Sequence, residues 1–391
     1  MTFRILSLDG GGIRGAISAT MLAAIEQKVG QPLNQYFNLI AGSSTGAILA
    51  AGIATGRTPQ DLVAIYQKKG SRIFPYKSLW SPERLGLVLQ YGLSAPKYSD
   101  KGLSEVLKEE FKYRTLSEVT GTKLLLLSYD TINREPIVFK SWRKKFINVP
   151  VWEACVCSAS APAYFPAHEL VRKEEGRVVG ADAKTITFSQ DASEDNDDYN
   201  RMAIEIIGGT GKGQTRTIVD YDGKTRRALV DAEWSVLPDA TSTFAVKLTY
   251  SAIDGGVAAN NPTACAIAEA LRLGYEVKDI SILSLGTGSF TREIPLKSAQ
   301  EWGAAQWALP ILDVIFDASS DINDYIAKQV LDSRYLRLQF NLDRSLTGKP
   351  LSDDMDDATP ENIRNLIEAA AVYVNHARVQ PAINRFLQSQ S

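Results

Sequence analysis

The sequence contains little cysteine and even less histidine. It includes three cysteines, Cys155, Cys157 and Cys265, and two histidines, His168 and His376. A small, odd number of cysteines argues against a disulfide scaffold and favours a reducing compartment, so a cytoplasmic location is expected. Cys155 and Cys157 have no second pair and no nearby histidine to complete a metal site, which favours buried thiols.

An excess of charge of one sign is also missing. The chain carries 43 Lys and Arg residues against 45 Asp and Glu residues, a formal net charge of −2. A nucleic-acid-binding surface normally requires a basic field, so no nucleic-acid partner is expected. Two acidic runs, residues 191–198 and 353–357, lack the glycine and the terminal glutamate of a calcium loop and are interpreted as solvated surface.

No hydrophobic run is interpreted as a membrane span. The segment Met1–Asp9 is too short, and reaches a charge too soon, for a signal peptide. Residues 29–56 carry no charge but contain Gly42-Ser-Ser-Thr-Gly46 in their middle, which favours a buried strand that runs into a buried helix. Any contact with a membrane would then be peripheral.

Apolar runs alternate with helical patterns over most of the chain. Short runs typical of buried strands are Phe3–Leu8, Phe37–Ala41, Leu124–Leu127 and Ile280–Leu285. Thr58-Pro59 is typical of a helix start, and this helix is expected to end at Gly70. The alternation predicts an α/β fold with three layers and a mainly parallel central sheet.

Residues 172–247 differ from this pattern. They are rich in Thr, Asp and Gly and contain short strand-like runs separated by turns such as Gly208–Gly213. We therefore expect a small all-β insertion between the two parts of one α/β domain, residues 1–171 and 248–391. The insertion is expected to act in substrate access or assembly, with a decoration that has no effect on function as the alternative.

A strand–turn–helix segment supplies a candidate nucleophile. Gly42-Ser-Ser-Thr-Gly46 fits Gly-x-Ser-x-Gly, in which a sharp turn between small residues lifts the middle serine, Ser44, out of a sheet. Another segment, Gly10-Gly-Gly-Ile-Arg-Gly15, fits a dinucleotide fingerprint, but the acidic residue that this fingerprint requires is missing. Its consecutive N–H groups could instead bind an oxyanion, and a simple tight turn is the plainer alternative.

The base that a serine nucleophile needs is not evident among the histidines. His168 follows a Phe-Pro-Ala loop and His376 lies in a C-terminal helical region, so both are interpreted as ordinary hydrogen-bonded side chains. Asp254 follows a short apolar run and precedes Gly255 and Gly256. This aspartate could present a carboxylate at the end of a strand.

Four segments, in this order, resemble the motifs of the patatin-like phospholipase family. They are Asp9–Gly15, Gly42–Gly46, Ala159–Pro166 and Asp254–Pro262, and Ser284–Gly288 is similar as well. The resemblance covers about residues 2–170 and 251–386 and leaves only the β insertion outside. It implies a three-layer patatin-like fold and a Ser–Asp dyad that hydrolyses lipid esters without a metal or a cofactor.

The resemblance also implies a role for each motif residue. Ser44 would attack the ester carbonyl, and Asp254 would accept its proton. The N–H groups that would hold the oxyanion are those of Gly10, Gly11, Gly12, Ile13 and Arg14. The glycines that would complete the motifs are Gly15, Gly42, Gly46, Gly255 and Gly256. The implied partner is a lipid ester; acyl transfer to an alcohol and a non-catalytic lipid-binding or storage protein are the alternatives.

Two aromatic-rich segments are candidates for a lid or for contact with lipid. They are Phe74–Leu93 and Glu301–Phe316, with burial in the core as the favoured interpretation for most of their residues. Contact through either segment would place the protein peripherally at a membrane surface. The sequence leaves the formation of an oligomer open.

Overall fold

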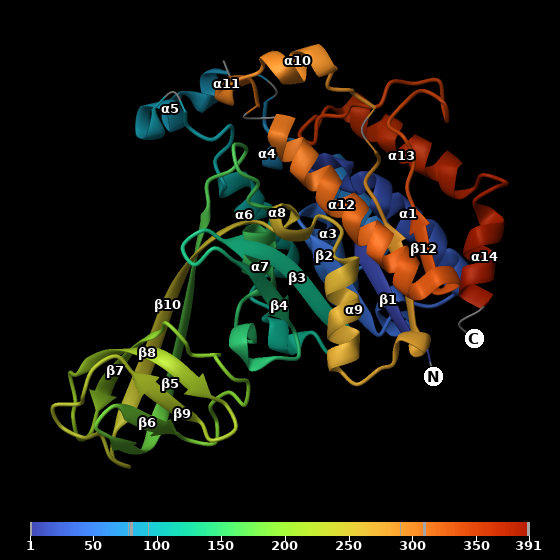
Figure 1. The fold of residues 1–391 in the computed structure, drawn as a ribbon. Coiled ribbons are helices and arrows are strands. Elements are labelled where there is room, and N and C mark those ends of the chain that lie inside the picture. Colours follow the sequence, from blue (N-terminus) through green and yellow to red (C-terminus); the bar gives the residue numbers. More distant parts are fainter. Residues whose placement is uncertain are drawn as a thin grey trace. The chain divides into compact units, whose positions relative to one another are not determined.

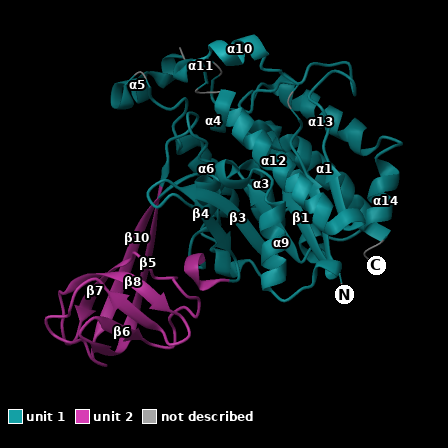
Figure 2. Cartoon of the chain, viewed as in Figure 1, with its two compact units in different colours: residues 1–142, 147–168, 251–391 teal, residues 143–146, 169–250 magenta. Residues whose placement is uncertain are grey.

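The structure is a computed structural model that describes residues 2–76, 78, 81–92, 94–289, 291–307 and 310–388. The chain divides into two units (Figure 2). The α/β unit consists of Met1–Trp142, Ile147–His168 and Ser251–Ser391, and the β unit consists of Arg143–Phe146 and Glu169–Tyr250. The β unit thus begins and ends three residues outside the expected insertion, 172–247, and also includes residues 143–146.

Parallel strands form the centre of the α/β unit, in the order β12, β11, β1, β2 and β3 (Figure 1). In that order they span Tyr335–Leu338, Ile280–Leu285, Phe3–Leu8, Leu39–Ser43 and Lys123–Asp130. Two antiparallel strands join β3, namely β4 (Glu135–Lys140) and the last residues of β10 (Thr243–Asp254). The expected mainly parallel sheet is therefore correct only for the central strands, because antiparallel strands extend it.

Helices cover both faces of this sheet, so that the α/β unit has three layers (Figure 1). On one face, α9 (Thr263–Arg272) and α12 (Pro310–Leu331) pack against alternate strand residues such as Ile5. On the other face, α3 (Thr45–Ala54) and α7 (Val151–Ala159) contact the strands. A strand that is covered on both sides has no face open to solvent, which explains why every residue of β11 is buried, including Ser281 and Ser284.

The other helices of the described α/β unit surround these layers. They are α1 (Gly15–Val29), α2 (Leu33–Tyr36), α4 (Pro59–Ile73), α5 (Leu85–Tyr91), α6 (Lys101–Phe111), α8 (Gly256–Ala259), α10 (Leu296–Glu301), α11 (Ala304–Trp307), α13 (Pro360–Val374) and α14 (Gln380–Gln388). The Thr58 cap of α4 is confirmed, but the helix continues past Gly70 to Ile73. A Cβ atom on Gly70 would lie 2.8 Å from Ile13 Cδ1, so close packing explains this glycine. Among the described residues, no helix combines the length and the apolar composition that a membrane span needs.

The β unit is a sheet that closes on itself. Its strands are β5 (His168–Asp182), β6 (Thr185–Phe188), β7 (Ala203–Gly208), β8 (Thr215–Asp222), β9 (Arg227–Val230) and the first part of β10. The order is β10, β5, β6, β9, β8, β7, and β7 pairs back with β10. Alternate residues such as Ile204 and Ile206 point into a separate core that contains Phe188 and Tyr221. A closed sheet has no unpaired edge strand.

Candidate active site

The Gly-x-Ser-x-Gly segment forms a sharp turn between β2 and α3. Ser44 has φ 54° and ψ −126°, a conformation that residues with a Cβ atom rarely adopt. A Cβ atom on Gly42 would lie 2.2 Å from the carbonyl oxygen of Gly46, and one on Gly46 would lie 2.1 Å from that of Leu8. Only glycine fits at these two positions. The turn therefore holds Ser44 at the carboxyl edge of the sheet.

Strand β10 brings Asp254 to the same edge. β2 pairs with β3 as far as Ser43, which lies opposite Leu127, and Asp254 pairs with the next residue of β3, Ser128. β4 pairs with the other side of β3, so the end of β10 continues where β2 stops. Two residues 210 positions apart in the sequence, Ser44 and Asp254, thereby become neighbours.

Ser44 and Asp254 are directly hydrogen-bonded. Ser44 Oγ donates to Asp254 Oδ2 at 2.6 Å, and the N–H of Gly256 donates to Oδ1 at 2.7 Å. Asp254 is fully buried, and Ser44 is 8% exposed. Burial raises the pKa of Asp254 to about 7, although the two hydrogen bonds oppose the rise because they favour the carboxylate. The carboxyl group thus changes charge near neutral pH, where a general base is effective.

Two serines at the end of α7 hold the backbone on both sides of this pair. The N–H of Ser44 donates to Ser158 Oγ at 2.9 Å, and the N–H of Gly255 donates to the carbonyl oxygen of Ser158 at 2.9 Å. The N–H of Asp254 donates to the carbonyl oxygen of Ser160 at 3.0 Å. Neither serine could be assigned a role from the sequence. Their only signal is that Ser160 lies inside the third family motif.

The glycine loop after β1 lies against Ser44. A Cβ atom on Gly10 would lie 2.9 Å from Ser44 Cβ. Some of the expected oxyanion donors already have partners: the N–H groups of Gly10, Ile13 and Arg14 donate to the carbonyl oxygens of Asn260, Met355 and Gly11, respectively. The N–H groups of Gly11 and Gly12 have no hydrogen-bond partner among the described residues. The candidate donors therefore narrow to Gly11 and Gly12, because a paired N–H is not available to an oxyanion.

The two histidines make other contacts. His168 Nε2 lies 3.4 Å from Glu153 Oε1, and His376 Nδ1 accepts the N–H of Arg378 at 3.2 Å. The interpretation of both as ordinary hydrogen-bonded side chains is consistent with these contacts. No contact between a histidine and Ser44 is found within the described ranges, so Asp254 is the titratable group that reaches the Ser44 hydroxyl.

An apolar pocket, partly open to solvent, lies beside Ser44. Most of its lining side chains are hydrophobic, among them Ile48, Ile73, Leu103, Phe165 and Met355. A pocket with this apolar lining suits an acyl chain. One candidate lid segment begins in its wall, because Phe74 also lines the pocket.

Few described residues of the candidate lid segments are buried, so the expectation that most of their residues lie in the core is wrong for the described part. Helix α5 has no buried residue, and its residues Leu85, Leu89 and Tyr91 are 60%, 80% and 51% exposed. Helix α11, in the second segment, also has none. Trp80 and Leu309 lie outside the described residues.

Among the described residues, the candidate active site contains neither a group of metal ligands nor a reactive thiol. In the part of the chain that the structure describes, no group of three or more His, Cys, Asp or Glu side chains could hold a metal ion. Cys155 and Cys157 are free and buried, as expected from the sequence. Burial raises the pKa of both thiols, so neither is a ready nucleophile or ligand.

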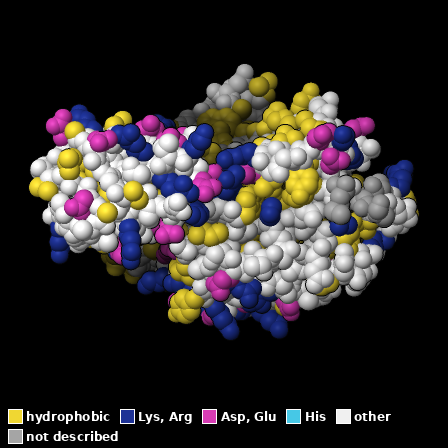
Figure 3. Space-filling model, turned by 90° about the horizontal axis from the view of Figure 1, so that it is seen from below, with side chains coloured by type: hydrophobic (Ala, Val, Ile, Leu, Met, Phe, Trp, Pro, Cys, Tyr) yellow, Lys and Arg dark blue, Asp and Glu magenta, His cyan; other side chains and the backbone are white. Residues whose placement is uncertain are grey.

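The acidic runs are only partly solvated. Asp198 pairs with Arg172 at 3.0 Å, and Asp356 pairs with Lys97 at 2.5 Å. Both carboxylates are buried, which corrects the expectation of solvated surface for these two residues. They are ion-paired inside the fold because a buried carboxylate needs a counter-charge. On the face drawn in Figure 3, basic and acidic side chains are intermixed.

The chain is similar to patatin-like proteins. Residues 6–187 match the family model described as patatin-like phospholipase. Patatin-like protein 2 from Oryza sativa subsp. indica is 26% identical, over 93% of this chain and 82% of that protein. Patatin-like protein 1 from Arabidopsis thaliana is 28% identical, over 93% of this chain and 79% of that protein. The protein named probable inactive patatin-3-Kuras 1, from Solanum tuberosum, is 27% identical over 98% of this chain and 91% of its own length.

Among solved structures, human GIVD cytosolic phospholipase A2 is similar over 99% of this chain and 63% of its own, with 12% identity and a TM-score of 0.42. The family match contains the glycine loop and Ser44 but ends before Asp254. The plant relatives extend the similarity over most of the chain. These comparisons confirm the resemblance expected from the sequence motifs: the chain is similar to patatin-like proteins over most of its length.

Proposed function

We propose that this protein hydrolyses carboxylic ester bonds of lipids through a dyad of Ser44 and Asp254. The observation that carries the proposal is the 2.6 Å hydrogen bond from Ser44 Oγ to Asp254 Oδ2 beside an apolar pocket. The family match supports lipid acyl hydrolysis in general. Phospholipids, lysolipids and glycolipids are the substrate classes to test.

In the proposed reaction, Asp254 accepts the proton of Ser44 while the serine oxygen attacks the ester carbonyl. The N–H groups of Gly11 and Gly12 stabilise the negative charge that develops on the carbonyl oxygen. The protonated Asp254 then donates its proton to the leaving alcohol, and the acyl group remains on Ser44. Water, which loses a proton to Asp254, then attacks this acyl ester, and Asp254 returns the proton to Ser44 Oγ as the fatty acid leaves.

Two alternatives lead to different products. If an alcohol replaced water at the acyl-enzyme, the protein would transfer acyl groups, and product analysis with added alcohols separates transfer from hydrolysis. A non-catalytic storage or binding protein is a relevant alternative because the potato relative is named probable inactive. The raised pKa of Asp254, about 7, supports catalysis over storage, since storage does not require a buried carboxyl group of this kind.

The decisive experiment uses two neighbouring buried serines. Ser44→Ala should abolish hydrolysis of a lipid panel and covalent labelling by a fluorophosphonate. Ser43→Ala is the matched control, because Ser43 is fully buried and its Oγ has no hydrogen-bond partner in the described structure. A fully active Ser44→Ala protein, labelled at another serine, would refute the proposal.

We further propose that α5 contacts the lipid surface. Its sequence, Leu-Gly-Leu-Val-Leu-Gln-Tyr, contains no charged residue, and its side chains Leu85, Leu89 and Tyr91 are exposed. Exposed apolar side chains of this kind are typical of a helix that lies in a membrane interface. The segment that carries α5 starts at Phe74 in the pocket wall, which would bring a lipid from the surface toward Ser44.

A further inference from the structure

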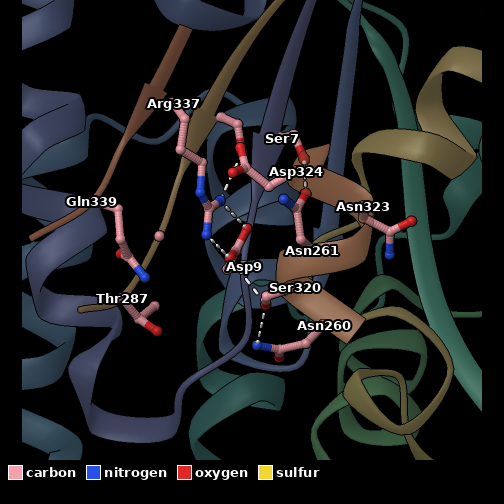
Figure 4. A network of polar contacts seen from close by, with 12 residues as sticks. Ser7, Asp9, Asn260, Asn261, Thr287, Ser320, Asn323, Asp324, Arg337 and Gln339 are labelled. Atoms are coloured by element: carbon pink, nitrogen blue, oxygen red, sulfur yellow. Dashed lines mark hydrogen bonds and ion pairs between the residues drawn. The ribbon is translucent and has the colours of Figure 1, made fainter. Parts of the chain in front are cut away.

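A buried ion pair lies next to the glycine loop (Figure 4). Arg337 of β12 reaches across β11 to Asp9, which follows β1; its Nη1 lies 2.8 Å from Oδ1 and its Nη2 lies 2.5 Å from Oδ2. Nη1 also donates to Ser284 Oγ of β11 at 2.8 Å. The two side chains are 11% and 2% exposed. A guanidinium that binds both carboxylate oxygens fixes the position and the plane of the carboxylate.

Asp9 is the residue from which the glycine loop starts. Its Oδ2 also accepts the Ser320 hydroxyl at 3.4 Å, and Ser320 Oγ accepts from Asn260 Nδ2 at 3.0 Å. The N–H of Gly10 donates to the carbonyl oxygen of Asn260 at 3.1 Å, and Thr287 Oγ1 donates to the carbonyl oxygen of Gly10 at 2.7 Å. These contacts hold the start of the loop, and Figure 4 shows the side chains of Asp9, Ser320, Asn260 and Thr287 close together.

The pKa values of Asp9 and Arg337 depend on each other, because each buried group is the counter-charge of the other. Burial raises the pKa of Asp9, while Arg337 and the Ser320 hydroxyl oppose the rise. Burial alone would lower the pKa of Arg337, but the carboxylate of Asp9 raises it above its usual range. Without the guanidinium, a buried carboxyl group would lose its counter-charge and would take up a proton or move toward water. Either response would displace the residue from which the loop starts.

We propose that Arg337, by holding Asp9, positions the N–H groups of Gly11 and Gly12 for the developing oxyanion. This inference rests on the proposed function. Arg337 is a positioning residue, because both of its Nη atoms bind Asp9 and it acts on the reaction only through the loop. The pair joins residues 328 positions apart, so no local motif of the sequence indicates it.

The test compares variants of the full chain on a soluble short-chain p-nitrophenyl ester. Arg337→Met should lower kcat about 100-fold, as the loss or misplacement of one oxyanion donor typically does, and should change KM less than about threefold. Arg337→Lys keeps the positive charge but not the bidentate contact with Asp9. Its kcat should therefore be about tenfold higher than that of Arg337→Met. The midpoint of the pH–rate profile should not move, because Asp254 is not altered.

The matched control is another ion pair of the α/β unit, Lys140 with Glu269, which lies at 2.7 Å with side chains 14% and 11% exposed. It joins β4 to α9 and has no contact with the glycine loop among its described interactions. Lys140→Met should lower the Tm, as Arg337→Met does, but should keep kcat within about twofold of the wild type. All rates are measured well below each Tm, so that loss of folded protein does not enter.

A folded Arg337→Met protein with the wild-type kcat would overturn the inference. If Arg337→Met does not fold, Arg337→Lys decides: a wild-type kcat overturns the inference, and a reduced kcat with an unchanged KM supports it. A wild-type protein that hydrolyses no ester, or that does so without Ser44, would instead refute the proposed function and the inference with it.

Discussion

Asp254 determines the expected pH dependence of the reaction. In the proposed reaction Asp254 is the base and must be ionised; because its pKa is about 7, kcat/KM for a soluble ester should rise with pH around a midpoint near 7. Asp254→Asn should lower kcat by about 10²–10⁴-fold. His168→Ala and His376→Ala should retain kcat within about twofold. If His376→Ala were as damaging as Asp254→Asn in a folded protein, a histidine would be the better candidate for the base.

The same carboxyl group should reduce stability above neutral pH. Its pKa rises from 3.8 to about 7 on folding, so the folded protein binds this proton more tightly, and the free energy of unfolding falls as pH increases from about 4 to 7. Asp254→Asn removes the buried charge. At pH 8 its Tm should exceed that of the wild type by several degrees, equivalent to about 2 kcal/mol, and the difference should shrink at pH 5. A variant less stable than the wild type at pH 8 would contradict this prediction.

At the scale of elements, β1 and α3 touch at the turn that carries Ser44. The missing side chain of Gly46 allows this approach, because a Cβ atom there would lie 2.1 Å from the carbonyl oxygen of Leu8. Gly46→Ala should therefore lower the free energy of unfolding by about 2 kcal/mol or more and abolish activity. Gly180→Ala, in β5, is the control, because a Cβ atom at Gly180 would meet no atom within 4 Å. Urea denaturation of both variants measures the difference.

Helix α5 should matter for lipid surfaces and not for the chemistry. The double variant Leu85→Ser/Leu89→Ser should keep its activity on a soluble short-chain ester and lose about tenfold on phosphatidylcholine vesicles, because burying two leucine side chains in lipid contributes a few kcal/mol at most. Ile322→Ser/Tyr325→Ser on α12 is the control; these side chains are 54% and 59% exposed. An equal loss on both substrates would show that α5 helps to form the pocket instead.

At the scale of the whole molecule, the β unit should be dispensable for the reaction. The elements that hold Ser44 lie in the α/β unit, and Ala252–Asp254 pair there with β3. Replacing residues 172–247 by a short Gly/Ser linker should therefore keep soluble-ester activity within a few-fold of the wild type, since loop length has a modest entropic cost. Assays on vesicles then measure any role in access. Loss of both activities in a folded deletion variant would show that the β unit helps to build the site.

Local patterns predict the local parts of the fold and of the site. The first strand, Phe3–Leu8, agrees with its prediction, and the turn around Ser44 follows from its glycines. The second strand was expected at 37–41 and lies at Leu39–Ser43, because apolar composition marks the buried run but not the register of pairing.

Long-range pairing could not be predicted in the same way. Gly10 and Gly11 look equivalent in the sequence, yet the N–H of Gly10 is occupied by Asn260, which is far away in the chain. The pairing of β7 with β10, which closes the β unit, likewise depends on geometry that no short motif records. Residue types indicate which groups could take part in the reaction. The topology determines which of these groups are left without a partner inside the fold and can contact a substrate.

The β unit enters and leaves the chain through adjacent strands, β5 and β10. A segment whose two ends lie side by side can be inserted at a single position of another domain without changing the order of that domain's own motifs. This explains how the family motifs on either side keep their order along the chain. The same connection makes residues 169–250 a place where one accessory module could be exchanged for another while the α/β unit is left as it is.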